Sequence, residues 1–350
     1  MPPDPACPAP PLRLALDSAA LAGNWHALQR LSGSARAGAA VKADGYGTGA
    51  RRAVQVLSAA GCRDFFVAHW SEAAELLDLI PADSLCVLHG PRDAAEAAWA
   101  RASGVRPVLN SLEQASLWRE GGGGPCHLMI DTGMNRLGLS RLDLAEPLLA
   151  GLDVDVLMSH LASAEDETPL NAAQLVRWNE ARASVPHRRA SLANSAGITL
   201  GTAYHGDLTR PGLALYGGVP CAALAPHIAQ VVRPEAALLQ VRTVTAGDTV
   251  GYNTTFIAPR AMRIGTVALG YADGYLRCWS GKGRLVAGRQ FLPVLGRVSM
   301  DLTIVDLTTA PDLREGDWLA VDYDLPHAAQ ETGLSQYELL TLLGRRFTRP

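Results

Sequence analysis

The chain has 350 residues, of which 48% are hydrophobic, and carries a formal net charge of -3, so one large domain and a smaller one can both bury cores. Basic and acidic residues are interspersed, which argues against nucleic acid or an anionic membrane as a partner. Its six dispersed cysteines form no C-x-x-C pair and are typical of reduced thiols, so we expect neither a disulfide framework nor a bound metal.

The first eleven residues, MPPDPACPAPP, include six prolines. They lack the basic and apolar regions of a signal peptide, so residues 1–11 are predicted to be a disordered leader. No apolar run approaches the length needed to cross a membrane. We therefore expect a soluble, cytoplasmic protein.

Short apolar runs and helical patterns alternate along residues 12–230. The runs are AAVKA (39–43), FFVAH (65–69), LCVLH (85–89), RPVLN (106–110), HLMID (127–131), VDVLMSH (154–160), RRASLAN (188–194) and, less clearly, a segment leading to LTRPGLALYG (208–217). The helical patterns are SEAAELLDLI (71–80), RDAAEAAWARA (92–102), LEQASLWRE (112–120) and NAAQLVRWNEARA (171–183). The alternation favours an α/β fold, a (β/α)₈ TIM-type barrel; a doubly wound open sheet is the alternative.

Residues 231–350 have a different pattern. Segments such as ALLQVRTVTAGDTVGYN and GRLVAGRQFLPVLGRVSMDLTIVDL alternate apolar and polar residues between Gly, Asp and Pro turns. This pattern predicts a mainly antiparallel β domain. The last run, LSQYELLTLLGRRF, is typical of a closing helix.

Lys42, in AVKADGYGTGA, is one of only two lysines in a chain that otherwise uses arginine for positive charge. A buried lysine can become a neutral amine, attack a carbonyl and act as a base, whereas arginine keeps its proton. Lys42 also ends a predicted barrel strand, where catalytic groups are placed in this architecture. A Schiff base is thus one interpretation of Lys42, and an ordinary surface lysine is the other.

Eight motifs in chain order carry a resemblance to a known family. They are AVKADGYGTGA (40–50), IDTGMNRLGL (130–139), SHLASAEDE (159–167), LANSAG (192–197), RPGLALYGG (210–218), VGYNTTF (250–256), GYADGYLR (270–277) and GRVSMD (296–301). The chain resembles alanine racemases from about residue 12 to residue 347. The resemblance implies a pyridoxal 5'-phosphate enzyme with an N-terminal barrel, a C-terminal β domain that residues 12–17 join, and a head-to-tail homodimer.

The resemblance implies interconversion of L-alanine and D-alanine by two bases on opposite faces of the substrate, and so a supply of D-alanine for peptidoglycan. Lys42 would hold the cofactor as an internal aldimine and act on one face. Tyr252 of the partner subunit would act on the other face. A tyrosine with a pKa near ~10 needs support to act as a base, and His160 is the matching residue for that support. Arg210 would face the pyridine nitrogen and keep it unprotonated.

Three further groups of residues follow from the resemblance. The cofactor phosphate would be held by Tyr46, Ser195, Gly212 and Leu213. The substrate would be bound by Arg136, Met300 and Asp301. The entrance would be lined by Tyr271, Arg277 and Glu165. Each of these residues has a plain structural interpretation when it is taken alone.

The chain departs from the family pattern at three positions. Met129 stands where many members have a carbamylated lysine that orients the arginine, so Arg136 must be balanced by Asn135, by an anion or by substrate. Ser191 replaces a histidine that supports the Arg210 position, and its smaller hydroxyl is expected to loosen that arginine's surroundings. Glu165 replaces a common aspartate, which leaves open whether Glu165 or Asp166 lines the entrance.

Competing functions remain open at the level of sequence. A broader-specificity amino-acid racemase or a decarboxylase would share the two-domain plan, although no late catalytic cysteine motif of the decarboxylases is present. A non-catalytic pyridoxal-phosphate carrier would explain a barrel with a reactive lysine. Such a carrier would leave the β domain, and Tyr252 within it, without a purpose.

Overall fold

The computed structural model describes residues 8–349 in two compact units. One unit is Ser18–Ala229, and the other joins Gln230–Pro350 to the N-terminal segment that ends at Asp17. Residues 1–7 of the expected leader lie outside the described residues. Pro11 was predicted to be the last residue of the leader, but its backbone carbonyl accepts a hydrogen bond from the Ala237 amide at 2.9 Å.

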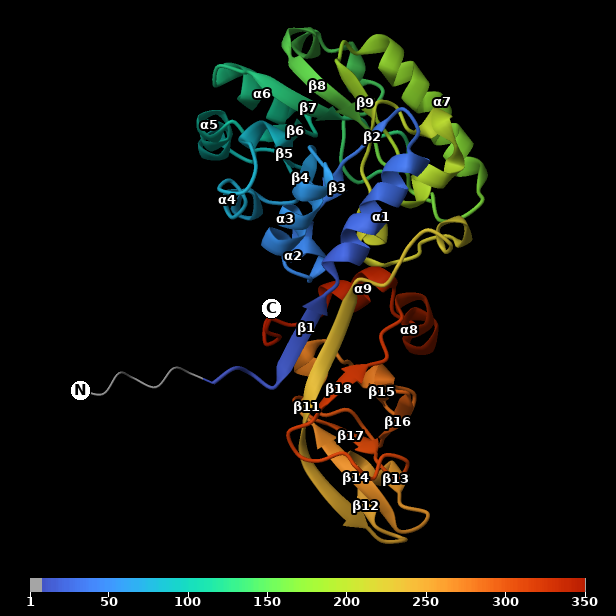
Figure 1. Ribbon diagram of the computed structural model, residues 1–350. Helices are drawn as coiled ribbons and strands as arrows, with labels where there is room; N and C mark the ends of the chain where they lie inside the picture. The colour runs from blue at the N-terminus through green and yellow to red at the C-terminus, as the bar shows by residue number, and fades with distance from the viewer. Residues whose placement is uncertain (1–7, 350) are drawn as a thin grey trace, which may run out of the picture. The chain divides into compact units, whose positions relative to one another are not determined.

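The unit Ser18–Ala229 is built on parallel strands that follow one another in sequence order (Figure 1). A seven-stranded sheet consists of β3 (Ala39–Ala40), β4 (Phe65–Val67), β5 (Leu85–Val87), β6 (Arg106–Leu109), β7 (Pro125–Met129), β8 (Asp153–Met158) and β9 (Arg189–Ser191). Two more short strands, β2 (Arg36–Ala37) and β10 (Leu208–Thr209), pair in parallel with each other.

The segment around β10 closes this sheet on itself. On one side, the Thr209 carbonyl accepts a hydrogen bond from the Gly38 amide, between β2 and β3, at 2.9 Å. On the other side, the Arg210 amide donates to the Ala193 carbonyl, just after β9, at 2.9 Å. The predicted (β/α)₈ barrel is therefore confirmed, and the doubly wound open sheet is excluded.

Helices connect the barrel strands. They are α1 (Ser18–Leu31), α2 (Lys42–Tyr46), α3 (Ala50–Ala60), α4 (Trp70–Ala74), α5 (Ala94–Ser103), α6 (Leu112–Glu120) and α7 (Pro169–Ser184). The helical pattern at residues 71–80 predicted too long a helix, because α4 ends at Ala74 and the chain continues in tighter turns that bury Leu76 and Ile80. Pro81 follows directly, and a residue before proline disfavours helical backbone.

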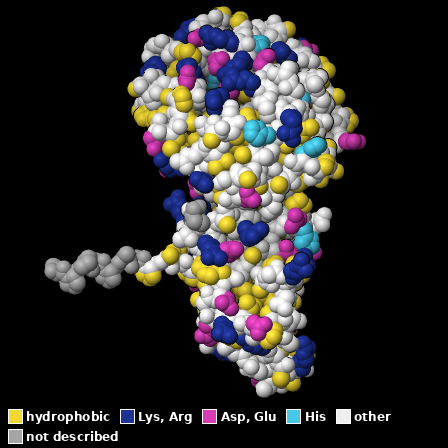
Figure 2. Space-filling model, viewed as in Figure 1, with side chains coloured by type: hydrophobic (Ala, Val, Ile, Leu, Met, Phe, Trp, Pro, Cys, Tyr) yellow, Lys and Arg dark blue, Asp and Glu magenta, His cyan; other side chains and the backbone are white. Residues whose placement is uncertain are grey.

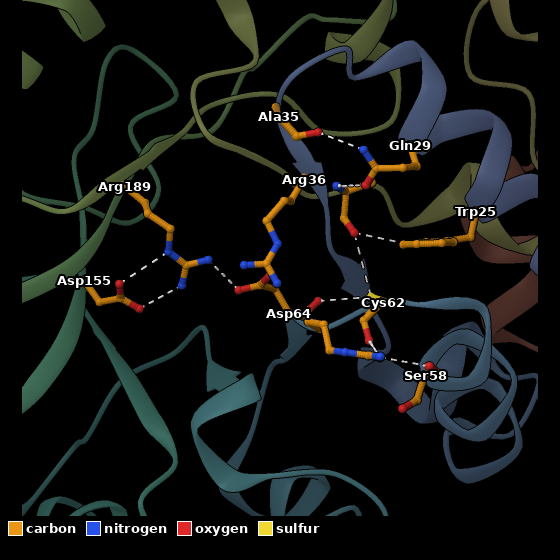
Figure 3. Close-up of polar contacts among 11 residues, drawn as sticks. Trp25, Gln29, Ala35, Arg36, Ser58, Cys62, Asp64, Asp155 and Arg189 are labelled. Carbon is orange, nitrogen blue, oxygen red and sulfur yellow. Dashed lines mark hydrogen bonds and ion pairs between the residues drawn. The ribbon is translucent and has the colours of Figure 1, made fainter.

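An ion-pair cluster lies at the N-terminal ends of the barrel strands (Figure 3). The Arg189 guanidinium donates to Asp64 at 2.7 Å and to both carboxylate oxygens of Asp155 at 2.8 and 3.3 Å. The three side chains are only 15–25% exposed. We assign this cluster to stability, because active sites occupy the opposite end of a barrel.

Replacing Arg189 with methionine should lower the free energy of unfolding by about 2–4 kcal/mol, because two largely buried carboxylates would lose the counter-charge that they share. The neighbouring Arg188 gives a matched control, since its ion pair with Asp153 is 59% and 43% exposed. Arg188→Met should change the free energy of unfolding by less than about 1 kcal/mol. Urea denaturation of the two variants measures the difference, and equal losses would contradict the assignment.

The second unit contains an antiparallel barrel-like sheet, as the alternating pattern predicted. Its strands are β1 (Leu12–Leu16), β11 (Val232–Val244), β14 (Met262–Val267), β15 (Arg284–Ala287), β16 (Gln290–Leu295), β17 (Thr303–Asp306) and β18 (Trp318–Val321), with a separate hairpin of β12 (Thr249–Val250) and β13 (Phe256–Ile257). The long strand β11 pairs with both β14 and β18, which closes the sheet. Strand β1 pairs antiparallel with β11, so the N-terminal strand belongs to this sheet.

The C-terminal region holds two helices, α8 (Leu325–Thr332) and α9 (Gln336–Thr341). The sequence indicated only one closing helix over residues 334–347, and α9 covers less than half of that run. Side chains of Asp324 and Ser335 cap the two helices by accepting amide hydrogen bonds at 3.0 and 3.2 Å. After α9 the chain returns to the sheet, where the Thr348 amide donates to Leu12 at 2.9 Å.

Basic and acidic side chains are scattered among polar and apolar ones on the visible face (Figure 2). None of the helices between residues 8 and 349 combines the length and the apolar character that a membrane crossing requires.

Candidate active site

Four of the expected site residues follow strands at the C-terminal mouth of the barrel. Lys42 comes two residues after β3, His160 two residues after β8 and Arg210 directly after β10, while Ser195 follows β9. The strands are parallel and neighbouring, so their ends converge at one mouth. The structure therefore brings together side chains that are up to about 170 residues apart in sequence.

Lys42 opens a left-handed turn. Ala43, Asp44, Gly45 and Tyr46 have φ values of 53°, 52°, 61° and 56°. A non-glycine residue in this conformation costs roughly 1–2 kcal/mol, so three of them together store strain that tertiary contacts must hold. The turn places Lys42 and Tyr46 at its two ends.

The Lys42 amine lies in a half-buried, mainly cationic environment. Burial lowers its pKa, and the nearby Arg136 guanidinium lowers the pKa further, while the Glu72 carboxylate opposes the shift. A lowered pKa increases the fraction of neutral amine at a given pH, which a nucleophile or base requires.

Arg210 is buried, with 7% of its surface exposed. Its guanidinium donates to the Ser191 hydroxyl and to the Ser159 and Leu192 carbonyls. Burial lowers its pKa to about 10, so it stays charged at neutral pH. No ion pair within residues 8–349 involves it, and a buried charge without a counter-ion is typical of a ligand site. Ser191 contacts Arg210 directly, where the sequence led us to expect looser support.

His160 faces the same cations. Burial, followed by the charges of Arg210, Arg136 and Lys42, lowers its pKa to about 3. The imidazole is therefore neutral at neutral pH, with one donor and one acceptor nitrogen. Such a ring can hold a hydrogen bond to a phenol without adding a further charge to the site.

Tyr46, Ser195 and Gly212 meet in a cradle at this mouth. Ser195 Oγ accepts hydrogen bonds from the amides of Gly212 at 3.0 Å and Ala214 at 3.3 Å. A Cβ on Gly212 would lie 2.2 Å from the Tyr46 hydroxyl, so only glycine allows this approach. The short helix η6 (Leu213–Tyr216) begins here, and first-turn amides have no partner within a helix.

The cradle suits an anion such as a phosphate group. Burial raises the pKa of Tyr46 to about 12, so its hydroxyl keeps a proton to donate. Hydroxyl groups and amides at a helix start are the donors that bind phosphate in proteins. These residues, with Lys42 and Arg210 at the same mouth, fit a pyridoxal phosphate.

Arg136 lies in the loop after β7, beside Asn135, whose φ is 55°. The Arg136 side chain is exposed, and the ion pairs found among the described residues do not include it. Met129 is buried, 7% exposed, and offers no charge to balance the arginine. Glu165 and Asp166 are both exposed in the loop before α7. Their relation to an entrance remains a prediction.

The other expected residues belong to the second unit. Tyr252 is 63% exposed in the turn between β12 and β13, where Asn253 and Thr254 have φ values of 60° and 53°. Met300 is 54% exposed, and its carbonyl accepts a hydrogen bond from Ala272 at 3.0 Å. An exposed tyrosine on a strained turn is typical of a residue held for contact with another surface.

Tyr271 and Arg277 lie together near Met300. The Arg277 guanidinium stands over the Tyr271 ring, 5.3 Å from its centroid. The Tyr271 amide donates to the Ser299 carbonyl at 3.0 Å, which links this segment to Met300. Asp301 pairs with Arg346 at 2.7 Å, a partner that the sequence did not indicate.

Two residues at the site were not predicted from the sequence. Tyr216 stacks on Tyr46, with ring centroids 4.9 Å apart, and donates to the Ala40 carbonyl at 3.0 Å. The Glu72 carboxylate accepts a hydrogen bond from the Ala43 amide at 2.6 Å. Tyr216 stands in the quoted motif RPGLALYGG, and Glu72 stands three residues after His69, at the position that caps a helix start.

Comparison with known proteins gives consistent matches over both units. The family model described as "Alanine racemase, N-terminal domain" matches residues 16–220, and "Alanine racemase, C-terminal domain" matches residues 231–350. A curated alanine racemase from Acidiphilium cryptum is 44% identical, with 96% of this chain and 97% of that protein covered.

Two solved structures show the same fold. An alanine racemase from Bartonella henselae with covalently bound pyridoxal phosphate has a TM-score of 0.89 and 34% identity, covering 98% of this chain and 99% of the other. A biosynthetic alanine racemase from Pseudomonas aeruginosa has a TM-score of 0.86 and 33% identity, covering 97% and 99% of the two chains.

Proposed function

Since this chain belongs to the alanine racemase family of pyridoxal-phosphate isomerases, we propose that Lys42 and Tyr252 are the two groups with which it interconverts L-alanine and D-alanine. The observation that carries this proposal is the barrel mouth, where a lysine of lowered pKa, a buried unpaired arginine and an anion cradle meet. When bound there, pyridoxal phosphate supplies an electron sink for the pair left at the substrate Cα.

In this proposal two residues transfer protons, one on each face of the substrate Cα. Lys42 would hold the cofactor and would take or return the substrate α-proton at its Nζ on one face. Tyr252 Oη of the partner subunit does so on the other face. The neutral His160 ring supports the phenol by a hydrogen bond. Arg210 would lie at the pyridine nitrogen of the cofactor and, being charged and unable to accept a proton, would keep that nitrogen unprotonated.

The cofactor phosphate is assigned to Tyr46, Ser195, Gly212 and Leu213. The Ser195 hydroxyl, which accepts the Gly212 amide, and the Tyr46 hydroxyl each keep a proton that they can donate to a dianion. Arg136 binds the substrate carboxylate, and its charge is balanced by the substrate itself when no protein carboxylate is close.

Four residues of the second unit, with one of the barrel, complete the assignment. Met300 and Asp301 form the wall contributed by the partner subunit. Tyr271, Arg277 and Glu165 line the entrance.

A head-to-tail homodimer with shared sites follows from the assignment of Tyr252 to the partner. Its 63% exposure in this chain is consistent with a contact completed by a second subunit. We also infer that the protein works in the cytoplasm, because the five described cysteines are free thiols. There the D-alanine formed would supply peptidoglycan synthesis.

The test of this function is hydrogen exchange during catalysis. The protein with pyridoxal phosphate is incubated with L-alanine in heavy water, and NMR with chiral analysis follows deuterium at Cα and the formation of D-alanine. We expect deuterated D-alanine. Exchange without inversion would refute the pairing of Lys42 and Tyr252 as opposed bases, and neither exchange nor inversion would favour a carrier or a racemase for another amino acid.

A further inference from the structure

Glu72, at the third position of α4, uses its two carboxylate oxygens for different partners. Oε2 accepts hydrogen bonds from the amides of Ala68 at 2.7 Å and His69 at 3.1 Å, which caps α4 at the end of β4. Oε1 turns away from this cap and accepts from the Ala43 amide at 2.6 Å. Ala43 is the residue after Lys42 and the first of the left-handed turn.

Another helix of the barrel, α6, has a side chain in the position that corresponds to Glu72 of α4. Gln114 occupies the same third position of α6, and its Oε1 accepts from the Asn110 amide at 2.7 Å. Its Nε2 donates to the His89 carbonyl, at the end of the preceding strand, at 2.9 Å. An amide side chain therefore suffices where the preceding strand presents a carbonyl. A carboxylate is needed at Glu72, because the left-handed turn presents an N–H group instead.

Glu72 is also the source of negative charge near the Lys42 amine. Arg136, His89 and His160 face the Lys42 amine with positive charge or with rings that become positive on protonation. Among the described residues that act electrostatically on this amine, Glu72 is the acidic one. The same carboxylate thus touches the Lys42 turn and opposes the cations around its amine.

We propose that Glu72 is a positioning residue for Lys42, holding the left-handed turn through the Ala43 amide and providing the counter-charge at the amine. This inference rests on the proposed function of Lys42. It goes beyond that function, because the helix cap alone would not require either the contact with Ala43 or a charged side chain.

The test compares E72Q with E96Q in the full-length chain freed of pyridoxal phosphate. E72Q keeps an oxygen for the cap, as Gln114 does, but loses the charge and the second acceptor. Glu96 is the matched control, since it accepts the Arg92 amide at the start of the next helix, at 2.8 Å. Hydrogen exchange by mass spectrometry follows residues 42–46 and helix α4 separately.

A second readout uses the scarcity of lysine. Because Lys42 and Lys282 are the chain's two lysines, acetic anhydride labelling across pH 6–10 gives one reactive site and one exposed internal reference. We expect the midpoint of Lys42 labelling to fall by about half a unit to one unit in E72Q, because an attractive charge is lost. Exchange in residues 42–46 should accelerate about tenfold. E96Q should change neither quantity.

Each other outcome overturns the proposal. Faster hydrogen exchange in α4 alone would show that Glu72 is only a helix cap. A Lys42 labelling midpoint that stays or rises would show that Glu72 is not a counter-charge.

E72D extends the test if E72Q does not fold. It retains the charge on a shorter side chain, so the Lys42 midpoint should stay near that of the unmodified chain while the turn exchanges faster. A midpoint for E72D that falls by about half a unit, as predicted for E72Q, contradicts the counter-charge.

The two proposals fail separately. Labelling and exchange are measured without substrate, so they report on Glu72 whether or not the protein racemises alanine. The heavy-water experiment reports on the reaction whether or not Glu72 holds the turn.

Discussion

Replacing Lys42 with alanine is expected to abolish both racemisation and the covalent retention of pyridoxal phosphate, with a loss of activity of at least about 10⁴-fold. The reason is chemical: in the proposed function the primary amine is both the point of attachment and one of the two proton-transfer groups. The barrel should remain folded, because Lys42 is not one of its buried core residues and the hydrogen bonds found among the described residues include none from its side chain. Visible absorbance after gel filtration and a chiral assay for alanine measure the two losses.

Lys42→Arg and Lys282→Ala are the informative companions of this variant. Lys42→Arg keeps a positive charge but no nucleophilic amine, so it should be as inactive as the alanine variant. Lys282→Ala removes the chain's other lysine, which is exposed and donates to the Glu331 carbonyl at 3.0 Å, and should retain full activity. If the Lys42→Ala variant still carried covalently bound cofactor, Lys282 would be the point of attachment and the assignment to Lys42 would be refuted.

The barrel was predictable because its signal is repeated along the chain. Runs such as FFVAH and LCVLH are short, apolar up to their final histidine and separated by helical patterns, which is what a strand buried on both faces requires. The position of Lys42 at a strand end followed from the same reasoning. The closing segment around β10 was less clear, since it is held by hydrogen bonds to two distant parts of the chain rather than by its own apolar pattern.

The turn after Lys42 could not be predicted from its residues. Of Ala43, Asp44 and Gly45, only glycine favours positive φ, so the local preference runs against the observed conformation. The contact that holds it comes from Glu72, on the next strand–helix unit. In the same way, the salt bridge of Asp301 depends on Arg346, 45 residues further along the chain. Tertiary contacts of this kind leave no periodic signal in a sequence.

Replacing Tyr252 with phenylalanine is expected to lower the rate of inversion severely while leaving pyridoxal phosphate bound. The change removes only the hydroxyl that would transfer a proton on the face opposite Lys42, at a cost of about 10²–10⁴-fold in racemisation. Lys42 should still exchange the α-hydrogen of the one enantiomer whose hydrogen faces it. NMR of L-alanine and D-alanine incubated separately in heavy water measures exchange for each enantiomer.

Tyr275→Phe is the matched control, because the Tyr275 hydroxyl is buried in the same unit and has no hydrogen-bond partner among the described residues. It should leave inversion intact. Equal exchange of both enantiomers by Tyr252→Phe would show that another group supplies the second proton.

Mixing the two inactive variants tests where Tyr252 acts. In a head-to-tail dimer of Lys42→Ala with Tyr252→Phe, one site combines both substitutions and the other combines an intact Lys42 with an intact Tyr252. Random pairing makes half of the dimers mixed, so co-refolding should restore about a quarter of the original activity. Each variant refolded alone should stay inactive. Dimers that form without any recovery would place both groups in the same subunit, and the exposed tyrosine between β12 and β13 would then require a different explanation.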